Sequence, residues 1–302
     1  MKHTLPELGP IKLYHRVEFE ELLRKYPPLI SEHTFTNLFM WRDFHKERWA
    51  RLDDWIVIEA MDKAGLPYFF APIGGGAGNI LSKCIEHLEK EGAADPRIER
   101  VPVPRGAGLV TNPAIGGTAE PDRNQFDYVY SSLDLIRLSG RKFHTQKNHL
   151  NKFRKTYSWS YERIGPDAVE ECLDLEGEWC HMKKCRENPG LAGEERAIMD
   201  VLQNMEALGT TGGIIRIDGK IEAFTLGERL NQDTAVIHIE KANPEIDGLY
   251  VAINQSFVEN ELAGYEFVNR EQDLGIPGLR AAKESYNPVK MIEKFIVRRK
   301  KA

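Results

Sequence analysis

A histidine and a glutamate that lie two residues apart could carry out proton transfer in this chain. The run Thr-Ala-Val-Ile-His-Ile-Glu at residues 234–240 is typical of a strand, and alternation puts His238 and Glu240 on one face. An amine that attacks a carbonyl group must lose a proton, which a nearby glutamate or histidine can accept. We interpret Glu240 as a candidate catalytic base with His238 as its partner. A polar pair on a half-exposed sheet is the alternative.

A dense group of charged residues follows the next predicted strand, residues 265–269. The sequence there reads NREQDLGIPGLRAAKESYNP. Its acids could hold a substrate ammonium group, and Arg280 and Lys283 could hold a carboxylate or a phosphate. A salt-bridged loop, with Arg270 paired to Asp273 for example, is the alternative. The predicted substrate-binding residues are Asn269, Arg270, Glu271, Asp273, Arg280, Lys283, Ser285 and Tyr286.

A basic stretch lies near the middle of the chain. Residues 137–155 contain seven lysines and arginines and no acid, although the whole chain has a formal net charge of -5. That balance argues against a general nucleic-acid coat but allows a local basic patch. The stretch indicates either an anion site for phosphates, such as an RNA end, or a solvated helix face. The candidate anion-binding residues are Lys142, Lys147, Asn148, Lys152, Arg154 and Lys155.

Composition and patterning exclude several classes of protein. The 302 residues are 41% hydrophobic and 29% charged, as in soluble globular proteins. No apolar run reaches the roughly 18 residues of a membrane span, and the first residues lack the apolar core of a secretory signal. We therefore expect a cytoplasmic protein. Its four cysteines, at positions 84, 172, 180 and 185, are irregularly spaced, so we expect them to be reduced and not to bind metal.

One order of predicted elements occurs twice along the chain. Two helices, three strands, a helix and a strand are predicted at 17–26, 35–46, 49–52, 55–59, 67–73, 79–90 and 98–103. The same order is predicted at 167–185, 193–208, 213–217, 221–226, 234–240, 249–262 and 265–269. Equivalent landmarks, such as Asp53 and Asp218, are separated by about 165–167 residues, which indicates a duplication. The helix between the last two strands makes a crossover and places its N-terminus beside their ends, where an anion could bind.

This double unit resembles the GNAT (acyl-CoA N-acyltransferase) fold in tandem. The stretches TNLFMWR at 36–42, LSGRKFH at 138–144 and KNHLNKF at 147–153 resemble the C-terminal domain of phosphatidylglycerol lysyltransferases and its soluble relatives. The resemblance implies an α/β (α+β) protein of two tandem GNAT-like units, each a mixed sheet flanked by helices. It also implies kinship with the Fem peptidyltransferases, which move an aminoacyl group from tRNA to an amine.

The loop before the second crossover helix indicates which acyl donor the chain could bind. GNAT enzymes that use acetyl-CoA carry a glycine-rich pyrophosphate loop there, whereas residues 242–248 contain Glu245 and Asp247 and a single glycine. Carboxylates beside a helix N-terminus would compete with a pyrophosphate. The first copy has more glycines, at residues 74–78, but no basic residue nearby. We therefore favour the 3′ end of an aminoacyl-tRNA as donor over an acyl-CoA, and predict no certain cofactor.

These observations predict two units, at residues 1–135 and 136–302, the first supporting and the second active. The predicted function is an acyl- or aminoacyl-transferase that acts on an amine and binds a small charged substrate and a tRNA acceptor end. The lipid-modifying relatives carry a large membrane region that these residues lack, so a phospholipid acceptor is not expected. The alternatives are a non-catalytic module that binds a metabolite or an RNA end, and an acetyl-CoA-dependent N-acetyltransferase.

Overall fold

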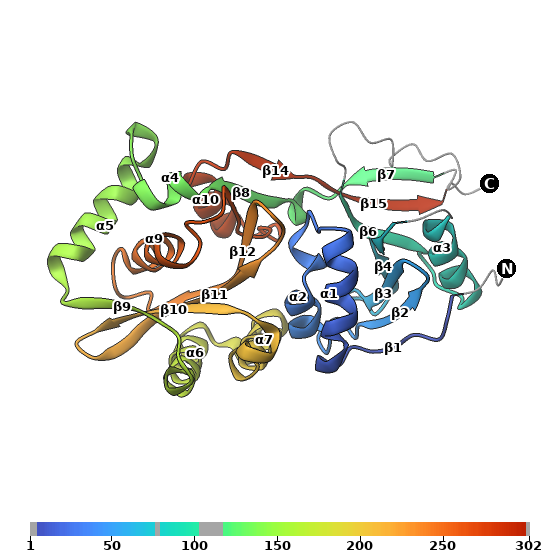
Figure 1. The fold of residues 1–302 in the computed structure, drawn as a ribbon, viewed down its shortest axis with the longest axis horizontal. Helices are drawn as coiled ribbons and strands as arrows, with labels where there is room; N and C mark the ends of the chain where they lie inside the picture. The colour runs from blue at the N-terminus through green and yellow to red at the C-terminus, as the bar shows by residue number, and fades with distance from the viewer. Residues whose placement is uncertain (1–4, 76–78, 103–116, 300–302) are drawn as a thin grey trace. The chain divides into compact units, whose positions relative to one another are not determined.

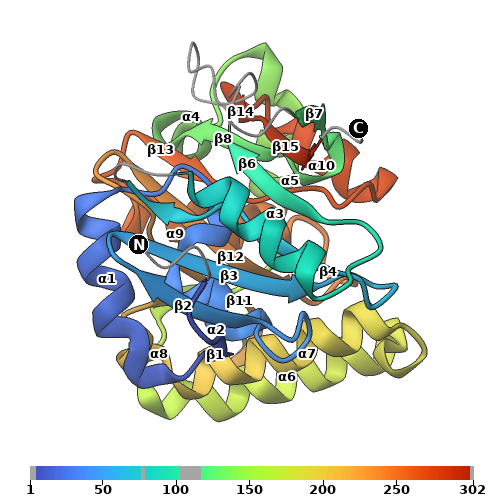
Figure 2. The same cartoon turned by 90° about the vertical axis from the view of Figure 1, so that its right-hand side faces the viewer.

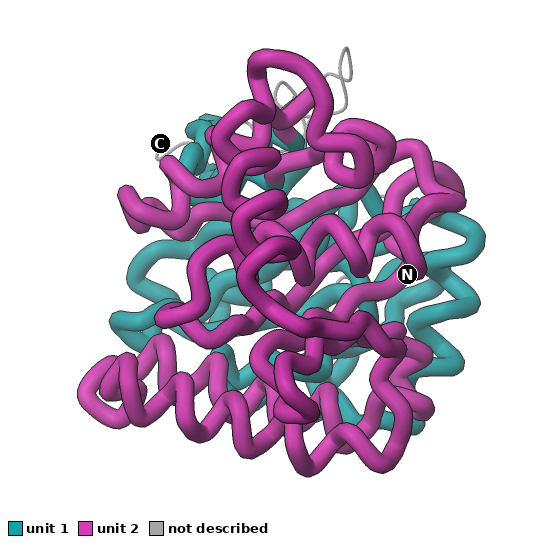
Figure 3. Tube along the Cα trace, turned by 90° about the vertical axis from the view of Figure 1, so that its left-hand side faces the viewer, with its two compact units in different colours: residues 1–127, 292–302 teal, residues 128–291 magenta. Residues whose placement is uncertain are grey.

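The architecture rests on two mixed β-sheets, each flanked by helices (Figure 1). The structure, a computed structural model, describes residues 5–75, 79–102 and 117–299. The chain forms two compact units (Figure 3). The first comprises residues 1–127 and 292–302, and the second comprises residues 128–291.

The sheet of the first unit has the strand order β1-β2-β3-β4-β6-β15-β7, with β5 paired to β3. Its strands are β1 (Gly9–Pro10), β2 (Arg48–Leu52), β3 (Trp55–Met61), β4 (Pro67–Phe70), β5 (Ile73–Gly74), β6 (Arg97–Pro102), β7 (Gly117–Pro121) and β15 (Lys294–Arg299). Its helices include α1 (Arg16–Lys25), α2 (Phe35–Trp41) and α3 (Ile80–Lys90). Strands β2, β3 and β4 are antiparallel, whereas α3 makes the crossover that leaves β6 parallel to β4.

The sheet of the second unit has the strand order β14-β8-β13-β12-β11-β10-β9. Its strands are β8 (Asp127–Ser131), β9 (Trp159–Arg163), β10 (Thr211–Ile217), β11 (Lys220–Arg229), β12 (Thr234–Ala242), β13 (Phe267–Asn269) and β14 (Lys290–Ile292). Its helices are α4 (Ser132–Arg137), α5 (His144–Thr156), α6 (Val169–Lys183), α7 (Pro189–Gln203), α8 (Met205–Leu208), α9 (Leu249–Glu261) and α10 (Pro277–Ser285). Helix α9 covers one face of this sheet and α6 the other (Figure 1).

The two units share the order of elements that the sequence predicts. The series α1, α2, β2, β3, β4, α3, β6 corresponds to α6, α7, β10, β11, β12, α9, β13. In both series two antiparallel pairs are followed by one parallel pair. In each copy the turn of the first hairpin contains an aspartate with a left-handed backbone conformation, Asp53 with φ 55° and Asp218 with φ 50°. Such turns match the twist of the flanking strands.

The division between the units differs from the expected boundary at residues 135 and 136. Strand β15 pairs with β6 and β7 in the first sheet, so the C-terminus does not belong to the second unit. In the same way β8 pairs with β13 in the second sheet. In each sheet, an antiparallel strand from outside the repeated series therefore lies next to the last repeated strand. Local sequence patterns do not reveal this exchange, because hydrophobic periodicity predicts a strand but not its partner.

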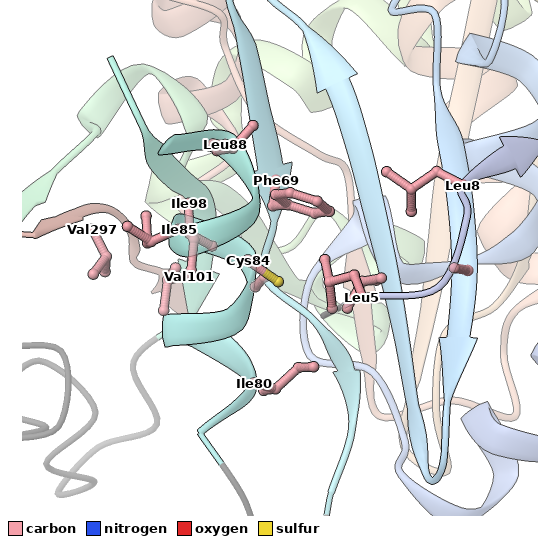
Figure 4. Packing of buried hydrophobic residues seen from close by; sticks show 13 residues of the cluster. Leu5, Leu8, Phe69, Ile80, Cys84, Ile85, Leu88, Ile98, Val101 and Val297 are labelled. Carbon is pink, nitrogen blue, oxygen red and sulfur yellow. The ribbon is translucent and has the colours of Figure 1, made fainter. Parts of the chain in front are cut away.

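Each unit has its own hydrophobic core. In the first unit, α3 lies across the sheet near β4 and β6 and buries Cys84 and Leu88 against Phe69 and Ile98 (Figures 2 and 4). In the second unit, Ile253 of α9 packs with buried residues of α5 and β10, and its neighbours on the helix are equally buried. These clusters fix the crossover helices and hence the strand ends beside them.

The cysteines do not all follow the expectation that they are reduced. Cys180, near the end of α6, and Cys185 form a disulfide with Cα atoms 5.0 Å apart. Their separation of five residues suits this bond because the chain reverses at Lys184, which is left-handed. Cys84 and Cys172 are free and buried. Within the described residues no group of His, Cys, Asp or Glu side chains is arranged as metal ligands, and no helix has the length and apolar character to cross a membrane.

Candidate functional site

Strands β12 and β13 separate in the middle of the second sheet. Their parallel pairing covers three residues of each strand and ends where Val236 lies opposite Asn269. Beyond that point β12 continues beside β11, and the chain after β13 stays with β8 through a hydrogen bond from the backbone of Arg270 to Tyr128. Side chains therefore fill the space between the diverging strands. Glu240 lies on the separated part of β12.

Glu240 is held by two residues from other elements. Its Oε2 atom accepts a hydrogen bond from Asn254 Nδ2 of α9 at 2.8 Å, and its Oε1 atom accepts one from Arg270 Nη2 at 3.0 Å. The side chains of Glu240 and Arg270 are each 13% exposed. Because the pair is only partly shielded from water, the carboxylate of Glu240 can be reached from the surface.

Aromatic rings surround the guanidinium group of Arg270. Its central carbon lies 4.7 Å from the ring centre of Tyr286 and 5.6 Å from that of Tyr130. Burial raises the pKa of Tyr286 to about 12, so its hydroxyl stays protonated at neutral pH. The rings fix the orientation of the arginine through cation–π contact.

Two buried polar atoms next to this ion pair lack a hydrogen-bond partner among the described residues. They are the donor Arg270 Nη1 and the acceptor Asn254 Oδ1. Buried polar atoms are hydrogen-bonded in the great majority of cases, so each such exception calls for a ligand, a water molecule or strain as its explanation. A donor and an acceptor on either side of a carboxylate could bind a carbonyl oxygen and an ammonium group.

His238 has other partners than the expected Glu240. Its Nδ1 atom lies 2.7 Å from Glu271 Oε1 and its Nε2 atom lies 2.9 Å from Glu228 Oε1. Burial lowers the pKa of His238, but the hydrogen bonds to the two carboxylates outweigh it and raise that pKa to about 10. The ring is therefore an imidazolium that donates from both nitrogens. It joins β11 to the chain after β13, while Arg270 and Asn254 orient Glu240.

Arg280 and Lys283, which were expected to hold a carboxylate or a phosphate, bind other residues of the second unit. Arg280 donates to both carboxylate oxygens of Asp273, at 2.8 and 2.9 Å. Asp273 is fully buried and also accepts hydrogen bonds from Tyr128 Oη at 2.6 Å and from the backbone of Gly275. Burial opposes ionisation of Asp273, but these hydrogen bonds lower its pKa well below the usual range. Lys283 donates to the backbone carbonyl of Arg270.

The remaining residues of the segment shape its backbone. Asn269 Oδ1 accepts a hydrogen bond from the backbone of Glu271, which is left-handed with φ 57°. Ser285 accepts a hydrogen bond from Gln146 of α5 at 3.0 Å. The segment therefore resembles the expected salt-bridged loop, with Arg270 paired to Glu240 instead of Asp273. Of its predicted substrate-binding residues, Arg270 and Tyr286 lie beside Glu240.

The N-terminus of α9 is covered by α5. A Cβ atom on Gly248, which precedes the helix, would lie 2.5 Å from the backbone oxygen of His149. The neighbouring Asp247 accepts hydrogen bonds from His149 Nδ1 at 2.8 Å and Lys152 Nζ at 2.7 Å. An acid and a second helix therefore occupy the place where a pyrophosphate would meet the helix dipole.

Most of the candidate anion-binding side chains contact their own unit. Lys142 donates to Asp134 at 2.7 Å and Arg154 donates to Gln255 at 3.0 Å, while Asn148 contacts His144. Lys147 and Lys155 make no ion pair with a described residue and leave positive charge on the surface of α5. Several side chains of this basic stretch thus bind residues of their own unit and are not directed only to solvent.

Several residues of this site were missed by sequence reasoning. Tyr130 belongs to β8, which was not predicted although Asp-Tyr-Val-Tyr-Ser alternates as a strand does. Asn254 begins a run of three polar residues in α9, and all three are buried. Adjacent polar residues inside a buried helix are a signal that could have identified this position.

Comparison with known proteins places the chain in a family. A statistical model of the family described as "Phosphatidylglycerol lysyltransferase, C-terminal" matches residues 23–298. The chain belongs to this family. No curated protein matches it. The predicted family is therefore confirmed, and the matched range includes every residue of the Glu240 site.

Solved structures show the same fold. A conserved protein of unknown function from Bacteroides thetaiotaomicron has 37% sequence identity and a TM-score of 0.90, over 98% of this chain and 100% of that chain. L-PGS from Bacillus licheniformis has 13% identity and a TM-score of 0.67, over 98% and 95% of the chains. FemX has 11% identity and a TM-score of 0.60, over 96% and 97%. The predicted GNAT-like α/β fold with two mixed sheets is confirmed.

Proposed function

We propose that the chain is an acyl- or aminoacyl-transferase that acts on an amine, with its reacting groups in the second unit. The observation that carries the proposal is the Glu240 side chain, held by Arg270 Nη2 at 3.0 Å, beside the Arg270 Nη1 atom that has no hydrogen-bond partner among the described residues. A base next to a spare hydrogen-bond donor is what attack by an amine on a carbonyl group requires.

Each group has a role in the proposed step. The amine nitrogen attacks the carbonyl carbon of the donor, and Glu240 accepts the proton that the nitrogen loses. Arg270 Nη1 donates to the carbonyl oxygen as negative charge develops on it. The new bond joins nitrogen to the acyl carbon, while the bond to the leaving oxygen of the donor breaks and that oxygen receives a proton. Asn254 Oδ1 accepts from the amine and orients it.

Two features support an aminoacyl-tRNA as the donor. Helix α5 and Asp247 cover the N-terminus of α9, which disfavours the pyrophosphate of an acyl-CoA. On the surface of α5, Lys147 and Lys155 could attract the phosphates of an RNA end. The family's name describes a lysyl transfer to phosphatidylglycerol, so lysyl-tRNA is the first donor to test.

A transfer assay with the full chain tests this function. The protein is incubated with tRNA that carries labelled lysine and with either a mixture of primary amines or phosphatidylglycerol vesicles. Label is expected in an amide product. Glu240→Gln should slow transfer by about 10²–10⁴-fold because it removes the base. Glu245→Gln, an exposed carboxylate in the loop before α9, is the matched control and should transfer at the wild-type rate.

The other outcomes would contradict parts of the proposal. Transfer only to phosphatidylglycerol would replace the amine by a hydroxyl acceptor. Transfer from acetyl-CoA and not from tRNA would make the chain an N-acetyltransferase. Binding of charged tRNA without transfer to any acceptor would favour the non-catalytic module.

A further inference from the structure

A carboxyl group lies on the buried face of helix α6, next to the disulfide. The buried residues of this helix are Cys172, Leu175, Glu176 and Cys180. Residues four positions apart are neighbours on one face of a helix, so Glu176 lies beside Cys180. Glu176 is only 1% exposed, which is rare for a glutamate. Because burying a carboxyl group costs free energy, its contacts should indicate what it does there.

The contact with sulfur indicates that Glu176 can hold a proton at neutral pH. Its Oε1 atom lies 3.7 Å from the Sγ atom of Cys180. A disulfide sulfur carries no hydrogen, so only the carboxyl group could donate in this contact. Burial raises the pKa of Glu176 to about 7, against the opposing charge of Lys241. An acid that can give up a proton therefore lies beside one sulfur of the disulfide.

The cation that contacts Glu176 has a closer carboxylate partner. Lys241 Nζ lies 2.9 Å from Glu194 Oε2 of α7 and 3.6 Å from Glu176 Oε1, and it lies 3.5 Å from the ring centre of Trp179. With Glu176 neutral, the charges of Lys241 and Glu194 balance. The other carboxyl oxygen, Glu176 Oε2, is buried and has no hydrogen-bond partner among the described residues. The carboxyl group can therefore change its protonation state without breaking a hydrogen bond of that oxygen.

The surroundings of the two sulfur atoms indicate which one a thiolate attacks. Cys185 is buried, but the residues on both sides of it, 181–184 and 186–190, are all exposed. Its neighbours Lys184 and Arg186 are cations, which attract an anionic thiolate. Cys180 lies in the last turn of α6, where burial and the helix dipole disfavour a thiolate. Attack at Cys185 is therefore favoured, and Cys180 needs a proton when the bond breaks.

We infer that Cys180, Cys185 and Glu176 form a thiol–disulfide exchange site, which reacts with a dithiol and in which Glu176 moves the proton of Cys180. One thiolate of the dithiol attacks Cys185 Sγ, and the bond between the two cysteines breaks. The electron pair stays on Cys180 Sγ, which takes the proton from Glu176. The second thiol of the dithiol, as a thiolate, then attacks the dithiol sulfur in the mixed disulfide and releases Cys185. The dithiol leaves as a disulfide, and solvent returns a proton to Glu176 and to Cys185.

The same groups serve the reverse reaction. When the disulfide forms again, the carboxylate of Glu176 takes the proton of the Cys180 thiol, and the resulting thiolate attacks a mixed disulfide at Cys185. This inference goes beyond the proposed function, because the exchange uses neither the acyl donor nor Glu240. A disulfide that only stabilises the fold would give the carboxyl group of Glu176 no part in the rate of exchange.

The rate at which dithiothreitol reduces the folded full chain tests the role of Glu176. Samples are quenched with acid and freed of dithiothreitol, and their cysteines are then alkylated in denaturant and counted by mass spectrometry. Glu176→Gln should slow reduction by about 10²-fold, the lower end of what a positioned acid contributes. The matched control is Glu178→Gln, an exposed carboxylate of the same helix that pairs with Lys220 at 2.8 Å, and it should be reduced at the wild-type rate. Equal rates for wild type and Glu176→Gln would overturn the inference, as would equal slowing in the control.

A series in urea separates exchange in the folded protein from reduction after unfolding. If only the turn around Cys185 opens, the rate for the wild type should change little at urea concentrations well below the unfolding midpoint. Slower reduction of Glu176→Gln under those conditions then cannot come from a change in global stability. A rate that rises from zero urea in step with global unfolding would mean that only the unfolded chain is reduced, which would overturn the inference. The series needs no variant, so it decides the question even if Glu176→Gln folds poorly.

Discussion

Arg270 and Glu240 form an ion pair across the space between the diverging strands of the second unit, with Nη2 and Oε1 3.0 Å apart. Glu240 lies on β12 and Arg270 directly follows β13, and Asn254 of α9 donates a second hydrogen bond to Glu240 at 2.8 Å. The carboxylate is therefore fixed from two directions before any ligand binds. Such preorganisation is what a catalytic base requires, because the protein need not rearrange when the proton is transferred.

The pair of Asp273 and Arg280 is expected to stabilise the fold. Asp273→Asn should lower the free energy of unfolding by about 1–3 kcal/mol, because the buried group loses its charge-assisted hydrogen bonds. Since the folded pKa of Asp273 is lowered, its contribution is present at neutral pH and is lost as the pH falls below about 4. Urea unfolding of wild type and variant at pH 7 and pH 3 should show the difference shrinking in acid. Arg280→Ala should change stability in the same direction and leave ligand binding at Glu240 intact.

His238 is expected to give the protein a basic limit of stability. Its folded pKa is about 10, above the ordinary value of 6.5, so its contribution is complete below about pH 6.5 and disappears as the pH rises through 10. His238→Gln should cost about 3–5 kcal/mol at neutral pH, because Glu228 and Glu271 lose the cation between them. The free energy of unfolding, measured with urea from pH 6 to 10, should fall more steeply with pH for the wild type than for the variant. Parallel curves would show that the ring is not charged in the folded state.

Lys294 is expected to hold the C-terminal strand in the first sheet. It is fully buried at the start of β15 and donates to Glu32 and Asp127. Lys294→Met should lower the free energy of unfolding by about 3–5 kcal/mol, because two buried carboxylates lose their cation. Lys220→Met is the control: its partner Glu178 is exposed, so the expected loss is about 0–1 kcal/mol. Similar losses in both variants would mean that Lys294 is not buried as described.

The disulfide between Cys180 and Cys185 is expected to respond to reductant. Closing so short a loop should contribute about 2 kcal/mol to the free energy of unfolding. Dithiothreitol should therefore lower the urea midpoint of the wild type, and Cys180→Ser should have the lower midpoint with or without it. Mass spectrometry after alkylation in denaturant should find two modified cysteines without reductant and four with it. Four modified cysteines without reductant would show that the bond is absent.

The repeated helices and strands of both units could be predicted from local sequence, whereas β8 and β15 were not predicted. The strand predicted at residues 234–240 corresponds to Thr234–Ala242, which is two residues longer. The predicted helix at 249–262 corresponds to Leu249–Glu261. Such predictions succeed because hydrophobic periodicity and turn residues act over a few positions. The hydrogen-bond partners within the site could not be predicted in the same way. His238 contacts Glu228 and Glu271 instead of Glu240, and Arg280 binds Asp273.

The sequence by itself determined the duplicated order of helices and strands and the family to which the chain belongs. Only the tertiary structure decided which charged residues meet. Arg270 could pair with Asp273, three residues away, yet it pairs with Glu240, thirty residues away, and Asp273 pairs with Arg280. The physical reason is that a side chain's partner depends on which strands are neighbours. Strands β8 and β15 each join a sheet beside distant segments, so no local pattern contains that information.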